Sequence, residues 1–241
     1  MAAIWCMARG DRERLAGRYE RAARQIQRGL VLLRNGGPLG EACRARLLNR
    51  LGMVYKYQGR LGLSGRAYCR AFRIATKLFP EDHSLLATHY HNLAGLEHAR
   101  GRYAEAEPLA RHGLAIRERV VGPKHPAVGR DLAALAAIVD GNGRHEEAEA
   151  LHRRALEILS RHRRSERREI AYATGNLAAC LRFLNRLDEA EVLGRRAMDL
   201  QLKALGSRHP DLAVSRDNLA AIRSASDAAP SPESPEDLPP M

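Results

Sequence analysis

Ten histidines raise the question of a metal site, because imidazole is the commonest metal ligand in proteins. His89, His91 and His98 would fall in one helix, in which His91 and His98, seven residues apart, share a face. Neither a carboxylate nor a cysteine completes a set with zinc-type spacing such as HExxH. We therefore predict no metal site and no other cofactor. His83, His125 and His209 lie where we expect helices to begin.

Motifs for catalysis are missing as well. The sequence has no GxSxG, no glycine-rich phosphate loop after a predicted strand, and no Cys–His or Ser–His–Asp arrangement that stands out. The four cysteines show no CxxC pairing and lie in apolar helical contexts, where a free thiol behaves as a small buried hydrophobe. We predict that the chain is not an enzyme and has free cysteines.

Positive charge is the strongest chemical feature of the chain. Lys and Arg number 40 against 28 Asp and Glu, which gives a formal net charge of +12. The segment after Arg223 contains four acidic residues and no basic one, so residues 1–223 carry +16. Such a field attracts acidic peptides, nucleic acid or anionic lipid.

The run RHRRSERR, from Arg161 to Arg168, concentrates five arginines in one connecting loop. It could contact nucleic-acid phosphates, but such runs are more often solvated turns, and no aromatic residues are interleaved for base stacking. Nucleic acid is therefore the alternative to an acidic peptide partner. No run of 18 apolar residues predicts a membrane span, and the first ten residues lack the apolar core of a secretory signal, so we expect a cytoplasmic protein.

A period of 42 residues organises the chain. Five leucines recur at this spacing, and a small residue follows each of them: Leu51, Leu93, Leu135, Leu177 and Leu219. Alanines recur in the same register, as at Ala106, Ala148 and Ala190, and small residues in register let two helices approach closely. A fixed period of this length is typical of helical repeats that stack into one continuous core.

Turn signals divide each repeat into two helices. Eight residues after the leucine stands Gly59, Gly101, Gly143 or Asn185, the two residue types that best tolerate a left-handed helix C-cap. New helices are predicted at His83-Ser84, His125-Pro126 and His209-Pro210, because proline suits the first turn of a helix.

The pattern predicts three regions. Residues 1–16 would hold a degenerate first helix, and residues 17–223 about five hairpins with a capping helix from His209 to about Arg223. Residues 224–241 are acidic and rich in Pro and Ser, and we expect them to be disordered. This tail could fold back on the basic body, because a tethered ligand has a high effective concentration.

Two segments, GRYAEAEPLARHGLAIRERVVGPKHPAVGRDLAALAAI and NRLDEAEVLGRRAMDLQLKALGSRHPDLAVSRDNLAAI, resemble the 42-residue tetratricopeptide repeats of kinesin light chains. The resemblance covers roughly residues 17–223 and implies an all-α, right-handed superhelical solenoid of antiparallel helix pairs. It also implies that the first helix of each pair lines a concave groove for an extended peptide or a partner helix. In such repeats an Asn before the Leu-Ala pair often hydrogen-bonds the ligand main chain. That Asn is present as Asn92, Asn176 and Asn218, whereas Arg50 and Ala134 replace it in two repeats.

Helical geometry adds further residues to this predicted groove, since residues three, four and seven apart share a face. The Arg and Lys side chains on this face would form ion pairs with carboxylates of the ligand, although solvated surface charges on arginine-rich helices would give the same pattern. The complete predicted set is Arg46, Asn49, Arg50, Lys56, His91, Asn92, Arg130, Tyr172, Asn176, Arg182 and Asn218. We predict a scaffold or adaptor that binds an extended or acidic peptide, which could also serve as one arm of a larger signalling system.

Overall fold

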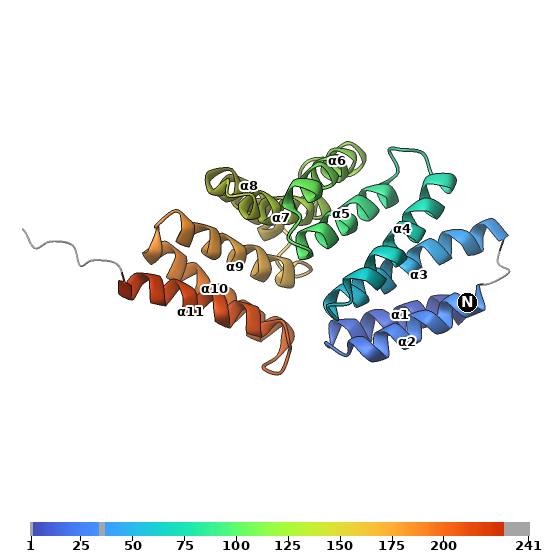
Figure 1. The fold of residues 1–241 in the computed structure, drawn as a ribbon, viewed down its shortest axis with the longest axis horizontal. Helices are drawn as coiled ribbons and strands as arrows, with labels where there is room; N and C mark the ends of the chain where they lie inside the picture. The colour runs from blue at the N-terminus through green and yellow to red at the C-terminus, as the bar shows by residue number, and fades with distance from the viewer. Residues whose placement is uncertain (1, 34–36, 229–241) are drawn as a thin grey trace, which may run out of the picture.

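The computed structural model describes residues 2–33 and 37–228, which form eleven helices and no strand (Figure 1). The all-α class implied by the resemblance is thus confirmed. In chain order, the helices are α1 (Ala2–Leu15), α2 (Tyr19–Leu32), α3 (Gly37–Tyr57), α4 (Leu61–Leu78), α5 (Ser84–Ala99), α6 (Tyr103–Val121), α7 (Pro126–Gly141), α8 (His145–Ser160), α9 (Arg167–Phe183), α10 (Leu187–Leu205) and α11 (Leu212–Ala228).

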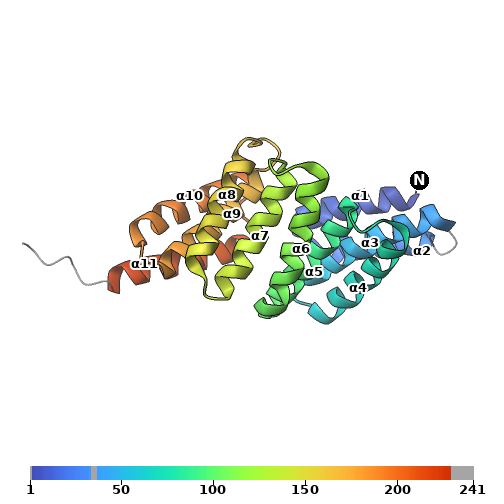
Figure 2. The ribbon, with the colours of Figure 1, turned by 90° about the horizontal axis from the view of Figure 1, so that it is seen from above.

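The helices pack as five consecutive hairpins, from α1–α2 to α9–α10, and α11 packs on α9 and α10. Each odd-numbered helix also packs against the next odd-numbered helix, whereas the backbones of the even-numbered helices come close only to their neighbours in sequence. The odd-numbered helices therefore form an inner wall and the even-numbered helices an outer layer. Figures 1 and 2 show the hairpins following one another along an arc.

Small residues in register form the contacts within this arc. Ala71, Ala155 and Ala197 are fully buried or nearly so, as are Ala106, Ala148 and Ala190. At Gly113, a Cβ would lie 2.9 Å from the Tyr90 Cβ, so α6 approaches α5 too closely for any side chain. The repeating leucines of α3, α7 and α9 are buried, and those of α5 and α11 are partly buried. The 42-residue repeat predicted from the sequence is confirmed.

The helix boundaries follow the predicted turn residues. Gly59, Gly101, Gly143 and Asn185 all have positive φ, and Asn185 is the one non-glycine residue with this conformation in the described ranges. The Nδ1 atoms of His83 and His125 each accept a hydrogen bond, at 3.1 Å, from the amide two residues later. These rings therefore cap α5 and α7, which explains why histidine recurs at helix starts.

The last helix differs from its predicted bounds. It begins at Leu212, three residues after His209, and ends at Ala228, five residues beyond Arg223. Residues 224–228 are thus helical although they were assigned to the disordered tail, and their Ser and Ala residues permit a helix until Pro230 approaches. Residues 229–241 lie outside the described residues. None of the helices in the described structure is long and apolar enough to cross a membrane.

Candidate peptide-binding site

A cavity of about 490 Å³ lies on the inner wall, between the two ends of the arc. It is lined from α3 by Lys56 and Tyr57, from α9 by Tyr172 and Asn176, and from α11 by Asn218. These helices are odd-numbered, so the hairpin order places their inward faces on one surface. Four residues of the predicted groove meet here: Lys56, Tyr172, Asn176 and Asn218.

The cavity lies where the first hairpin meets the turn before α11. The Tyr19 hydroxyl donates a hydrogen bond of 3.1 Å to Oδ1 of Asp211, and the Tyr172 hydroxyl donates to Oδ2 of the same carboxylate. A Cβ on Gly17 would lie 2.9 Å from Cδ of Pro210. Burial, assisted by the Asp211 charge, raises the pKa of both tyrosines, so both hydroxyls keep the proton they donate. These contacts join the two ends of the arc and so close it into a ring.

Lys56 is the unusual group in this cavity. Burial lowers the pKa of its ammonium group, and no carboxylate of the described chain forms an ion pair with it. Its Nζ lies 5.9 Å from the centroid of the Tyr57 ring and 3.1 Å from the position of a Cβ on Gly95. A desolvated cation without a counter-ion favours binding of an anionic group.

Several other predicted groove residues already have partners within the chain. Arg50 binds Asp11 at 2.7 Å, Arg130 binds Glu166 at 2.7 Å, and His91 binds Asp131 at 2.8 Å. Asn92 donates a hydrogen bond of 3.0 Å to Asn49, and both side chains are buried. Arg182 lies over the Phe183 ring at 4.1 Å, and Arg46 is exposed. The structure therefore brings together only part of the predicted set.

A second cavity of about 480 Å³ adjoins the first and shares Asn176 with it. His98, Asp140, His145 and Phe183 line it. His145 Nδ1 lies 2.7 Å from Asp140 Oδ1, and the Cys180 thiol donates to the His145 carbonyl at 3.2 Å. These three side chains could offer three metal ligands, but burial raises the pKa of the Cys180 thiol to about 12, which opposes thiolate coordination at neutral pH.

Sequence reasoning missed Tyr19, Asp211 and the Asp140–His145–Cys180 cluster. Tyr19 and Asp211 are 192 residues apart, and their contact depends on the curvature of the whole arc. Cys180 reaches His145 from the following hairpin, 35 residues away. No local spacing signals either contact.

The family model described as tetratricopeptide repeat matches residues 43–119, 85–161 and 169–229. The chain belongs to the tetratricopeptide repeat family. Among solved structures, BtubC (BKLC) from P. vanneervenii is similar at 22% identity and a TM-score of 0.66, covering 87% of this chain and 84% of that one. Nearly identical TPR-like repeats of a candidate kinesin light chain from Podosopora anserina are similar at 24% identity and a TM-score of 0.59, covering 78% and 88%. No curated protein matches the chain.

Tetratricopeptide repeats generally mediate protein–protein interactions and typically have no enzymatic activity. The structural likeness, at identities below 25%, concerns the fold alone.

Proposed function

We propose that this tetratricopeptide repeat protein is a scaffold or adaptor that binds an extended, acidic segment of a partner protein on its inner wall. The observation that carries the proposal is Lys56, a partly desolvated cation without a carboxylate partner in residues 2–33 and 37–228. A ligand carboxylate there would gain a charge-assisted hydrogen bond without displacing an internal ion pair.

Asn176 and Asn218 would hold the main chain of this segment. Each side-chain amide offers both donors and an acceptor, which is what a peptide backbone requires. Neither amide hydrogen-bonds to another described residue, in contrast to Asn92, which is bonded to Asn49. The Tyr57 and Tyr172 rings would supply apolar walls, and Arg46 and Arg182 lie on the same helices and could meet further carboxylates.

The test begins with selection of peptides from a random library on the full-length protein, followed by fluorescence anisotropy with the selected peptide. We expect enrichment of Asp and Glu. Lys56→Met should weaken binding about 10- to 100-fold, the value of one charge-assisted hydrogen bond. Lys124→Met is the matched control, because Lys124 is exposed in the turn before α7 and does not line the cavity, so this variant should bind as the wild type does.

Asn176→Ala and Asn218→Ala should each weaken the same peptide about fivefold. Asn142→Ala, at an exposed turn, is their control. The proposal fails if the selected peptides are not acidic, or if Lys56→Met and Lys124→Met have equal effects. An RNA oligonucleotide that binds more tightly than any selected peptide and responds to Lys56→Met would instead support a nucleic-acid ligand.

A further inference from the structure

The net positive charge of the protein comes from its first two hairpins. Residues 1–79 contain 17 Lys and Arg against 4 Asp and Glu, whereas residues 80–241 contain 23 against 24. The first third of the chain therefore carries +13 and the remainder −1. Helix α4 has four cationic residues and no acidic one. Charge this uneven on a repeat fold indicates a surface with a specific role rather than a general excess of arginine.

The outer layer shows where the two halves differ. In α6, α8 and α10, a Glu and the Arg one turn later form an ion pair at equivalent positions: Glu107–Arg111, Glu149–Arg153 and Glu191–Arg195. The first two of these arginines also reach a Glu of the next hairpin. At the same register, α4 has Gly65 and Cys69, so the series of ion pairs ends there.

Three arginines of α4 are consequently left without a counter-ion. Arg66, Arg70 and Arg73 are exposed, and their side chains form no hydrogen bond or ion pair with the described part of the chain. Their spacing of four and three residues places them on one face of the helix. Neighbouring like charges repel, so an anionic partner on this face would relieve the repulsion as well as add contacts.

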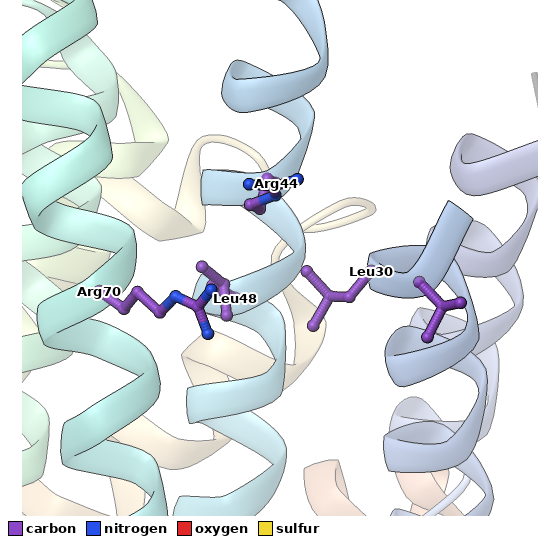
Figure 3. A pocket seen from close by; sticks show the side chains of 5 residues that line it. Leu30, Arg44, Leu48 and Arg70 are labelled. Carbon is purple, nitrogen blue, oxygen red and sulfur yellow. The ribbon is translucent and has the colours of Figure 1, made fainter. Parts of the chain in front are cut away.

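These arginines border a groove with an apolar floor, which we call the outer basic groove. Two cavities of about 460 and 500 Å³ adjoin here and share Leu48 and Arg70. Leu30, Leu48, Leu51 and Leu63 give the groove its apolar surface, from α2, α3 and α4. Figure 3 shows Leu30 and Leu48 facing each other across the first cavity, with Arg44 and Arg70 beside them.

One guanidinium of the groove is held in place. Arg44 binds Glu41 at 2.6 Å and donates to the Leu33 carbonyl at 2.5 Å. Beside it, Val31 is 56% exposed although it lines the first cavity. The groove thus combines a fixed cation, three unpaired cations and apolar surface that remains open to water.

We propose that the outer basic groove is a second binding site, for an amphipathic acidic segment of a partner protein. Leucine or other aliphatic side chains of the segment would cover the apolar floor of the groove, and its carboxylates would pair with Arg66, Arg70 and Arg73. Phosphate-backbone binding explains the arginines but not the apolar floor, and a membrane surface cannot follow a recessed floor. This site lies on the outer layer and is separate from the inner-wall site proposed above.

The test uses the full-length protein and a fluorescein-labelled peptide of Glu and Leu, with Leu at every third or fourth position. Arg70→Glu/Arg73→Glu should weaken binding at least about tenfold, because two attractive charge pairs become repulsive. Arg163→Glu/Arg164→Glu is the control of equal net charge, at exposed residues in the loop between α8 and α9, and should change binding less than about twofold. Val31→Ser should weaken binding about threefold without affecting the fold, since Val31 is exposed.

Cys69 supplies an independent readout, because it is exposed and lines the groove. A bound peptide should slow the reaction of Cys69 with a maleimide dye. Equal loss of affinity in the two double variants, or unchanged Cys69 labelling at saturating peptide, would overturn the proposal. The proposal would also be overturned if phosphatidylserine vesicles or a single-stranded RNA protected Cys69 from the maleimide dye and the peptide did not. Lys56→Met should leave this peptide bound, which separates failure here from failure at the inner wall.

Discussion

Two buried histidines predict that the protein loses stability in mild acid. His89 and His152 are 1% and 0% exposed, and no ring nitrogen of either has a hydrogen-bond partner in the described structure. Burial lowers the pKa of each imidazole from 6.5 to about 4. The cause is that the apolar interior disfavours the charged imidazolium.

The sign and size of the effect follow from proton linkage. Between pH 6.5 and pH 4 the unfolded chain binds more protons than the folded one, so stability falls as the pH drops through this window. Each histidine should lower the free energy of unfolding by about 2 kcal/mol at pH 5 and by about 3 kcal/mol below pH 4. Because domains are stable by only about 5–15 kcal/mol, two such residues can bring the protein close to unfolding at pH 5.

Urea unfolding of the wild type and of His152→Leu, monitored by circular dichroism at pH 7.5 and 5.0, tests this reasoning. Leu has a similar volume, does not titrate, and leaves no unpaired ring nitrogen. The variant should lose about 2 kcal/mol less than the wild type between the two pH values. His162→Gln, at an exposed loop residue, should lose as much as the wild type. Equal losses in His152→Leu and the wild type would refute the assignment.

Three further experiments test the packing of α6 on α5, the closure of the ring and the accessibility of the cysteine thiols. Gly113→Ala should destabilise the protein by about 1–3 kcal/mol in urea unfolding, because the added Cβ would collide with α5. Gly62→Ala, in open space on α4, should instead stabilise the protein by about 0.5–1 kcal/mol. Equal effects of the two substitutions would contradict the close approach of α6 to α5. Asp211→Ala removes the acceptor of both tyrosine hydroxyls, so small-angle scattering should show a larger radius of gyration, and an unchanged radius would mean that the contact does not hold the ring. Cys69 should react with a maleimide dye in the folded protein and Cys180 only after unfolding, as mass spectrometry of the labelled peptides would show.

The repeat architecture could be predicted because its signals are local. A residue such as Asn185 marks a turn by its own backbone preference, and an alanine such as Ala148 marks a close helix contact wherever it recurs in register. The 42-residue period and the backbone preferences of the turn residues together predict how each hairpin packs against the next. The end of α11 could not be placed in this way, since the last helix has no following hairpin to define its boundary.

The sequence could predict which helix faces form the candidate site, but not which of their side chains are available to a ligand. The family resemblance placed both Asn92 and Asn176 on the inner wall, but Asn92 is bonded to Asn49 and Asn176 lines the cavity. Which amide is free depends on a neighbour one repeat away, whose identity varies between repeats. Arg50 is likewise occupied by Asp11, 39 residues earlier, and nothing in the period indicates that pair.

The ion pairs of the outer layer and the ring closure have complementary effects on the two ends of the solenoid. Each exposed pair contributes little alone, but the pairs from α6 to α10 connect successive hairpins, so the later hairpins are tied together by charge as well as by apolar burial. The α3–α4 hairpin lacks these pairs and carries mutually repelling arginines, so it should be the less stable end. The hydrogen bond of Tyr19 to Asp211 anchors this end to the turn before the capping helix, beyond the last of the ion-paired hairpins. An anionic segment bound in the outer basic groove would then supply to the first two hairpins the counter-charges that glutamates supply to the others.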